Sequence, residues 1–273
     1  KNNGNLYKAR SFLAENGFSE VINFPFSSKK ENDSISIDNP LDSKRNNFRT
    51  SLKDSLVDNL LYNERRQKDS VKLFEISDIY TNDEHLEQQK KLGIIVSGRL
   101  GNNYRDFTKK LDCKYLDELL NIDTNNDLFN IIEIPRDILD TKKKDQIFFV
   151  EISLENIPSN FFPDIRTDKK TNFITYEPVS EFPSSTRDFS FSINDLSKVN
   201  IVISMLNKVS DKLIKNSFIF DFYQNKKLNI VKIGYRFIFQ SNLKTLSDEE
   251  INKKVDEILE PILQLDGVSI PGM

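Results

Sequence analysis

Five side chains near the end of the chain are of the types that bind single-stranded RNA. They lie in three runs of alternating apolar and polar residues, TRDFSFSI, IFDFYQNKKL and KIGYRFIFQS. Successive side chains of a β-strand point to opposite faces, so these runs predict strands with one polar face. Splayed RNA bases stack on aromatic or guanidinium planes and form hydrogen bonds through their edges. The polar face offers such groups in Ser190, Tyr223, Lys232, Arg236 and Gln240.

The opposite face of these strands is apolar and rich in phenylalanine. We expect it to be the core beneath helices, because packing explains so many aromatic residues more simply than base stacking does. It comprises Phe189, Phe191, Ile193, Phe218, Phe220, Phe222, Ile233, Tyr235, Phe237 and Phe239. The helical residues expected to pack on it are Ile201, Met205, Val209, Leu213, Val255, Ile258, Leu259 and Ile262. Ile219 and Asp221 then join Tyr223 on the polar face, for which an ordinary solvated surface is the alternative interpretation.

Two helices and a short last strand complete this region. Apolar residues at helical spacing cover Ser197–Lys215 and Leu246–Leu265, and Val268–Ile270 has the pattern of a strand. Ser247 and Glu250 have the spacing of a capping box, which would start the last helix. The order strand, helix, strand, strand, helix, strand predicts a ferredoxin-like βαββαβ domain with helices on one face of its sheet. The other face is then free to meet a partner.

The upstream part has the pattern of an α+β domain with an antiparallel sheet. Helices are expected at Leu6–Asn16, Ser51–Arg66 and Lys114–Leu120, and strands at Val21–Phe26, Val71–Tyr80, Leu92–Ser97, Ile131–Ile134 and Ile147–Ile152. Prolines and charged residues between Pro158 and Pro183 indicate a domain boundary near Thr175. We therefore expect two domains, residues 1–174 and residues 175–273.

The chain resembles the C-terminal part of the β subunit of bacterial phenylalanyl-tRNA synthetase in six fragments that follow in the same order. They are GFSEVINFPF, IDNPLDSKRNNFRTSLKDSLVDNL, KLFEISDIY, PVSEFPSSTRDFSF, FDFYQNKKL and FQSNLKTLSDEEI. The resemblance covers nearly the whole chain. It implies a catalytic-like class II synthetase module followed by a ferredoxin-fold anticodon-binding domain. Members of this family have further domains upstream, so we expect this chain to be the C-terminal part of a longer subunit.

The resemblance also bears on the chemistry of the first domain. Phe48 and Arg49 fall where class II synthetases have a Phe-Arg pair, whose arginine clamps the ATP α-phosphate. Thr50, Ser51 and Leu52 follow here instead of an acidic residue, and no set of the eight glycines makes the third class II motif. The resemblance therefore implies a degenerate module without catalytic residues, in which Arg49 forms a structural ion pair or contacts a partner. ATP binding by Arg49 is the alternative.

The resemblance implies a supporting role in a larger enzyme. The segment would scaffold the catalytic α subunit in an (αβ)₂ tetramer and bind the anticodon region of tRNA(Phe). The whole enzyme would use ATP and Mg²⁺ to charge the tRNA with phenylalanine, while this segment would bind no cofactor. One alternative is a detached β-like interaction or regulatory protein without tRNA binding. Another is an independent ligase, which the missing third motif disfavours.

Composition excludes several other classes of function. The net charge of −3 argues against nonspecific nucleic-acid binding through overall charge, and we expect no DNA partner. No apolar run approaches the roughly 20 residues of a membrane helix, so we expect a cytoplasmic protein without a membrane partner. The only histidine, His85, lies in a polar stretch, and the only cysteine, Cys113, has no evident catalytic histidine. The sequence therefore predicts neither a metal site nor a cysteine nucleophile.

Overall fold

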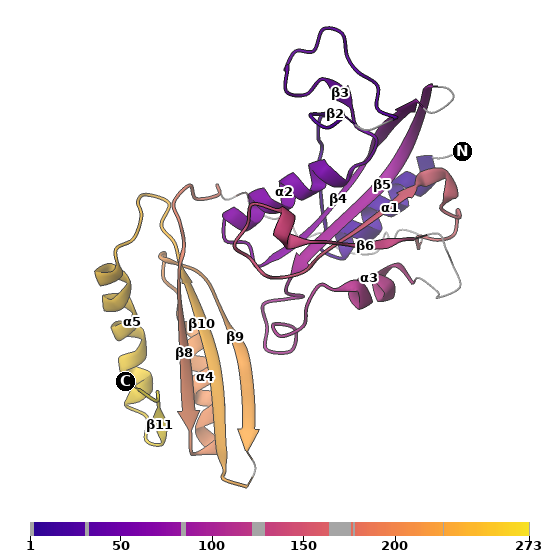
Figure 1. The fold of residues 1–273 in the computed structure, drawn as a ribbon. Coiled ribbons are helices and arrows are strands. Elements are labelled where there is room, and N and C mark those ends of the chain that lie inside the picture. Colours follow the sequence, from indigo (N-terminus) through magenta and orange to yellow (C-terminus); the bar gives the residue numbers. More distant parts are fainter. Residues whose placement is uncertain are drawn as a thin grey trace. The chain divides into compact units, whose positions relative to one another are not determined.

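The computed structural model describes residues 3–30, 33–82, 86–121, 129–163, 176, 178–225 and 227–272. The chain divides into two compact units (Figure 1). The first unit comprises Lys1–Gly98 and Lys110–Thr171, and the second comprises Arg99–Lys109 and Asn172–Met273. The boundary expected near Thr175 and the sole histidine, His85, lie outside the described residues.

A five-stranded sheet forms the centre of the first unit within these described ranges, in the order β1-β4-β5-β7-β6. Its strands are β1 (Ser19–Glu20), β4 (Ser70–Asn82), β5 (Leu86–Gly98), β7 (Ile147–Ser153) and β6 (Ile131–Ile134). The first strand pairs with β4 in parallel, and the other neighbours pair antiparallel. The expected α+β fold with an antiparallel sheet is thereby confirmed.

Helix α2 (Lys53–Arg65) packs its apolar side on this sheet. Leu52, Leu56 and Leu60 are fully buried in one core cluster with residues of β4, β5 and β7. A β carbon at Gly93 of β5 would come within 2.8 Å of the Leu56 side chain, so the glycine lets the helix approach the sheet closely. The unit also contains α1 (Asn3–Glu15), α3 (Cys113–Leu120) and the short 3₁₀ turns η1 (Arg136–Ile138) and η2 (Leu154–Asn156).

The strand expected at Val21–Phe26 is wrong for most of its length. The strand β1 ends at Glu20, and only Phe26 joins β2 (Phe26–Ser27), which pairs with β3 (Asn47–Phe48). Between them, the backbone N–H and the side-chain amide of Asn23 donate to the Glu75 carboxylate at 3.3 and 2.8 Å. These hydrogen bonds take the place of a strand ladder, and Pro25 has no N–H to contribute to one.

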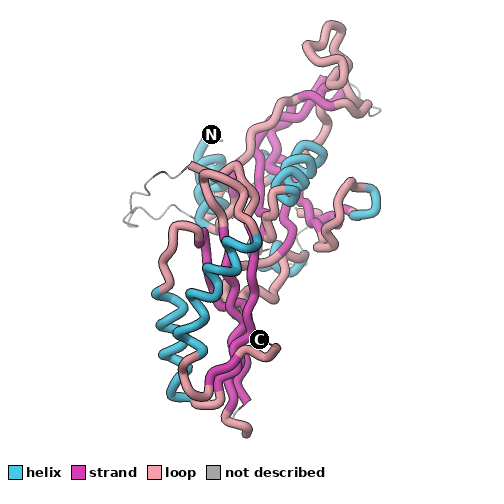
Figure 2. The backbone as a smooth tube through the Cα atoms, turned by 90° about the vertical axis from the view of Figure 1, so that its left-hand side faces the viewer, coloured by secondary structure: helices cyan, strands magenta, loops and turns pink. Residues whose placement is uncertain are grey.

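The second unit has the expected ferredoxin-like order, which is confirmed. It runs β8 (Ser185–Ile193), α4 (Val199–Lys208), β9 (Ile214–Asn225), β10 (Ile230–Phe239), α5 (Asp248–Leu263) and β11 (Val268–Ser269), with a 3₁₀ turn, η3 (Leu196–Lys198), before α4. These strands form an antiparallel sheet in the order β11-β8-β10-β9. Figure 2 shows both helices on one side of the strands, which leaves the other face of the sheet without a helix.

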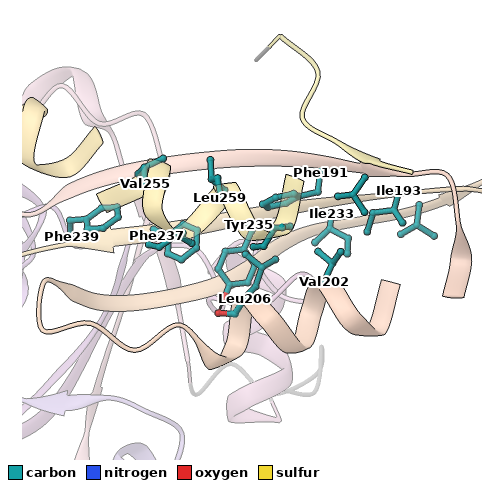
Figure 3. Close-up of a cluster of buried hydrophobic side chains, with 14 of the residues drawn as sticks. Phe191, Ile193, Val202, Leu206, Ile233, Tyr235, Phe237, Phe239, Val255 and Leu259 are labelled. Carbon is teal, nitrogen blue, oxygen red and sulfur yellow. Dashed lines mark hydrogen bonds between the residues drawn. The ribbon is translucent and has the colours of Figure 1, made fainter. Parts of the chain in front are cut away.

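The core of the second unit lies between this sheet and its helices (Figure 3). Tyr235 is fully buried at its centre and donates a hydrogen bond to the Ser217 hydroxyl at 3.1 Å. Helix α4 contributes Val202 and Leu206, which are fully buried, whereas the expected core residue Ile201 is exposed. The expected core residues Met205, Val209 and Leu213 do pack against this core, so Ile201 is the one wrong assignment in this region.

The ends of both helices are set by local hydrogen bonds. The capping box expected at the start of α5 is confirmed, since the Ser247 hydroxyl accepts from the Glu250 N–H and the Glu250 carboxylate accepts from the Ser247 N–H. Helix α4 ends at Lys208 instead of Lys215. In the turn that follows, the Asp211 carboxylate accepts from the Leu213 N–H at 2.8 Å, directly before β9 begins at Ile214.

Among the helices of the described ranges, none has both the length and the apolar character that crossing a membrane requires.

Candidate nucleic-acid interface

The face of the second unit's sheet that points away from α4 and α5 is called the outer face here. Three of the predicted residues lie together near one end of it. Lys232 stands opposite Tyr223 on β9 and opposite Ser192 on β8. Ser190 precedes Ser192 by two residues and stands opposite Gly234. Tyr223 is 53% exposed, and Ser190 and Lys232 are exposed as well. This end of the outer face therefore presents an aromatic ring, a cation and a hydroxyl to solvent.

A β-bulge interrupts the alternation of β9 in the middle of the strand. Gly234 of β10 stands opposite Asp221, but the next residue, Tyr235, stands opposite Ile219, so Phe220 has no partner of its own. One extra residue in a strand moves every later side chain to the other face. Ile219 consequently packs on the core, while Phe218 stands opposite Arg236 on the outer face.

The bulge overturns part of the expected division of faces. Phe218 and Phe220, expected in the core, lie on the outer face, and Ile219, expected on the polar face, packs on the core. Phe222 packs on the core, as predicted. Alternation therefore assigned the faces correctly after the bulge and inverted them before it, because nothing in the sequence marks the inserted residue.

Phe220 lies across Gly234 on the outer face. A β carbon at Gly234 would approach two atoms of the Phe220 ring to 2.8 and 2.9 Å. Only a glycine leaves room for the ring there. The ring is thus held flat against the middle of the sheet, beside Arg236.

Residues Arg99–Lys109 cover this middle part of the outer face within the second unit. The buried ring of Phe107 lies 5.5 Å from that of Phe220 and 5.9 Å from that of Phe218, measured between ring centroids. The Arg236 guanidinium lies 5.1 Å from the centroid of Phe107 and 5.5 Å from that of Phe220. A guanidinium at such distances is attracted to aromatic rings.

Arg236 is also engaged with the neighbouring strand. Its Nε and Nη2 atoms donate to the two carboxylate oxygens of Asp188 at 2.8 and 2.7 Å. Its side chain is 19% exposed. Arg236 therefore lies on the same face as Tyr223 and Lys232, but in the part that Phe107 covers, with its charge balanced by a carboxylate.

Gln240 lies just beyond the end of β10 and holds adjacent segments together. Its Nε2 atom donates to the Phe182 carbonyl at 2.6 Å, and its Oε1 atom accepts from Lys215 at 2.5 Å. Its backbone N–H donates to the Leu213 carbonyl at 2.8 Å. The structure thus gathers Ser190, Tyr223 and Lys232 at the exposed end and places Gln240 in a network of internal bonds.

Sequence reasoning missed the Arg99–Lys109 segment. Its own hydrogen bonds shape it, since the Asn103 side-chain oxygen accepts from the N–H groups of Arg105 and Asp106. Hydrogen bonds from Asn103 and then Lys109 lower the pKa of the Asp106 carboxyl. The turn therefore favours the ionised form of Asp106. Two aromatic residues among four cations in RLGNNYRDFTKK were the available signal, but the segment lies far in sequence from the sheet that it covers.

In the first unit, Arg49 is 4% exposed and lies beside the Glu75 carboxylate at 2.9 Å. Its guanidinium also donates to the Ser55 hydroxyl at 3.2 Å and to the Asp78 carbonyl at 3.3 Å. Phe48 packs between Phe26 and Tyr80, with ring centroids 5.4 and 4.7 Å away. The positive charge of Arg49 is therefore balanced inside the protein.

A hollow of about 610 Å³ adjoins this pair between α2 and the β2–β3 hairpin. Its rim carries large apolar side chains exposed to solvent. Ile22 is 93% exposed, Phe24 is 70% exposed, and Tyr62 projects from α2. Such exposed apolar groups around a hollow are typical of a surface that a protein partner covers.

Two family models match the chain, and together they cover most of it. Residues 2–123 match the model described as the phenylalanyl tRNA synthetase beta chain CLM domain. Residues 180–270 match the ferredoxin-fold anticodon binding domain. The second match contains the exposed end of the outer face with Ser190, Tyr223 and Lys232.

Curated relatives align along nearly the whole chain. The chloroplast phenylalanine–tRNA ligase β subunit of Pyropia yezoensis is 26% identical over 302 residues, which cover 94% of this chain and 40% of that protein. The β subunits of Thermotoga maritima and Fusobacterium nucleatum are 27% and 28% identical, and their alignments cover 91% and 93% of this chain and 36% of each relative. The chain therefore spans two fifths or less of the length of these relatives.

Proposed function

The chain belongs to the phenylalanyl-tRNA synthetase β-chain family, and from this membership we propose that it supports the charging of tRNA(Phe) with phenylalanine. Residues 175–273 bind the anticodon region of the tRNA. Residues 1–174 form a non-catalytic class II module that scaffolds the catalytic α subunit in an (αβ)₂ assembly. ATP and Mg²⁺ serve the whole enzyme and are not held by this segment. We place the assembly in the cytoplasm, as the counterpart of the bacterial relatives.

One observation carries the RNA part of this proposal. Tyr223, Lys232 and Ser190 lie exposed and adjacent on the sheet face that has no helix, in the part of the chain that matches an anticodon-binding model. Tyr223 offers a ring for base stacking, Lys232 offers a cation for a phosphate or a base, and Ser190 offers a hydroxyl. Arg236 and Gln240 act as positioning residues, because both are engaged in internal hydrogen bonds.

The test is binding of a tRNA(Phe) anticodon stem-loop to the whole chain, measured by fluorescence anisotropy. Loss of one base–aromatic stack costs about 1–3 kcal/mol, so Tyr223→Ala should weaken binding about 5- to 150-fold. Lys232→Ala should weaken it and lower the salt slope by about one. Tyr7→Ala and Lys253→Ala are matched controls, since both residues are exposed and neither is part of the outer face, Tyr7 being on α1 of the first unit and Lys253 on α5. Unchanged binding by both outer-face variants would contradict the proposed RNA site.

The scaffold part rests on the apolar rim of the hollow in the first unit. Ile22 and Phe24 are exposed there, and obligate interfaces are built from such apolar surface. Co-expression with the α subunit, followed by chromatography with light scattering, should give a stable complex. Phe24→Asp should dissociate it, whereas Leu41→Asp, an exposed apolar residue outside the hollow, should leave it intact.

The alternative of a detached interaction protein makes a different prediction. Such a protein would bind a partner through the same rim but would bind the anticodon stem-loop no better than an unrelated hairpin. Catalysis by this segment alone is not proposed, because the charge of Arg49 is balanced by Glu75. Calorimetry should accordingly detect no ATP binding in the micromolar range.

A further inference from the structure

The tip of the Arg99–Lys109 segment carries two exposed side chains that can stack on RNA. Tyr104 is 39% exposed, and Arg105 beside it is exposed as well. We propose that Tyr104 and Arg105 extend the RNA-binding surface of the second unit beyond its ferredoxin-like sheet, and that their ligand is single-stranded RNA. This inference rests on the proposed function, because it concerns the same RNA ligand.

Phe107 fixes the segment in place. Its ring contacts Phe218, Phe220 and the Arg236 guanidinium on the sheet, and the Arg99 guanidinium lies 4.1 Å from its centroid. Arg99 also donates to the Phe107 carbonyl at 2.8 Å. The segment is thus anchored by one buried ring, which leaves the tip residues in a defined position without burying them.

Tyr104 lies next to the strand that carries the exposed Tyr223. Its ring centroid is 5.6 Å from that of Phe222, the neighbour of Tyr223 on β9. Phe222 points to the core face and Tyr223 to the outer face, and β9 is at an edge of the sheet, so the tip lies at the free edge of β9. An RNA loop that stacks on Tyr223 would therefore have to cross the free edge of β9 to reach Tyr104 and Arg105.

The two tip residues are arranged for stacking. The Arg105 guanidinium lies 5.6 Å from the Tyr104 ring centroid, and its Nε atom donates to the Tyr104 hydroxyl at 3.3 Å. Aromatic and guanidinium planes are the two surfaces on which single-stranded bases stack. Because the pair is already assembled, little side-chain freedom is lost when a base binds.

Charge favours RNA as the ligand. The segment has three cations, Arg99, Arg105 and Lys109, and one anion, Asp106, within a chain whose net charge is −3. Asp106 is held by Asn103 and Lys109 inside the turn. The tip is therefore locally basic on an acidic chain, as contact with a phosphate backbone requires.

The experiment compares loop variants in the whole chain with the tRNA(Phe) anticodon stem-loop as the probe. Tyr104→Ala should weaken binding about 5- to 150-fold, the range for loss of one base–aromatic stack. Tyr104→Phe keeps the ring and should bind within about twofold of the parent chain. Arg105→Ala should weaken binding and lower the salt slope by about one. Thr108→Ala, an exposed residue of the same segment, is the matched control.

The outcomes separate this inference from the proposed function. If Tyr223→Ala weakens binding but Tyr104→Ala and Arg105→Ala do not, the tip is not part of the RNA surface, while the anticodon-binding role stands. If none of the three weakens binding, the proposed function itself fails. If Tyr104→Ala tightens binding, the segment shields the sheet from RNA, and the inference is overturned. Hydrogen exchange at Phe107 checks that each variant keeps the segment anchored.

Discussion

The ring of Phe220 lies across Gly234 so closely that a β carbon at Gly234 would be 2.8 Å from it. This contact joins the bulged strand to its neighbour and supports the surface on which Phe107 rests. The outer face is thus divided into a covered middle and an exposed end, and each part can be tested separately.

Gly234→Ala should destabilise the second unit by about 1–3 kcal/mol, because the added methyl group forces the Phe220 ring to shift. Urea unfolding followed by tyrosine fluorescence measures this. Gly4→Ala is the control, since no atom lies within 4 Å of a β carbon there and alanine favours the helix. A stability of Gly234→Ala equal to that of the parent chain would show that the ring moves without cost.

Arg49→Ala should cost about 3–5 kcal/mol of stability in the first unit, because it leaves the Glu75 carboxylate buried without its cation. Arg49→Met should be destabilised in the same way. The double variant Arg49→Met with Glu75→Gln should recover part of that lost stability, because no unpaired carboxylate is then buried. Lys29→Ala, which breaks an exposed pair with Asp54, should cost at most about 1 kcal/mol. Thermal unfolding of the four variants checks the order, and equal effects of Arg49→Ala and Lys29→Ala would refute it.

Arg236→Lys should loosen the Arg99–Lys109 segment, because an ammonium cannot make the two parallel bonds to Asp188 or stack between two rings. We expect faster hydrogen exchange and faster proteolysis in that segment, with a loss of about 1 kcal/mol in global stability. Lys253→Ala on α5 serves as the control. Unchanged protection of residues 99–109 would mean that Phe107 alone holds the segment.

Asp211→Asn should reveal a pH-dependent contribution to stability. Hydrogen bonds from Lys254 and then from the Leu213 N–H lower the pKa of the Asp211 carboxyl in the folded chain. A folded pKa below the unfolded value of about 3.9 stabilises the chain above that pH, and the contribution disappears as pH falls toward the folded value. The variant should lose about 0.5–1 kcal/mol at pH 7 and nearly nothing once both states are protonated. Urea titrations at several pH values test this, with Asp256→Asn on α5 as the control.

Tyr223→Ala in the assembled αβ enzyme should raise the apparent KM for tRNA(Phe) about 5- to 150-fold. Amino-acid activation, measured by ATP–pyrophosphate exchange, should be unchanged, because the proposed contact is to RNA and the exchange reaction uses only the amino acid and ATP. Impaired activation with normal tRNA affinity would contradict the assignment of Tyr223 to RNA binding.

The order of elements in the second unit could be predicted from the sequence because local rules decide it. Alternation along each strand, apolar spacing in the helices and the Ser247–Glu250 capping box each act over a few residues. The same rules failed for Ile201, because Ile201, Val202 and Ile203 are consecutive apolar residues and spacing alone does not decide which of them faces the sheet. They also failed for Val21–Phe26, where bonds from Asn23 to the distant Glu75 replace a ladder.

The candidate site was less accessible to sequence reasoning than the fold. The positions of Ser190, Tyr223 and Lys232 on one face of the sheet follow from alternation alone, so these positions could be predicted. Phe218 and Phe220 were misplaced because a bulge is decided by pairing with Gly234 and Tyr235 and leaves no periodic signal. The proposed role of Tyr104 and Arg105 could not be predicted from the sequence, because their position depends on Phe107 packing on residues more than a hundred positions away along the chain.

The second unit is assembled from two pieces of chain that are far apart in sequence, Arg99–Lys109 and Asn172–Met273. A graft that moves only residues 172–273 into another protein would leave behind the ring that covers Phe218 and Phe220, and would expose both to water and to other copies of the graft. Transplanting this module intact therefore also requires the Arg99–Lys109 segment that carries Phe107, supplied as a second insertion or as a linked peptide.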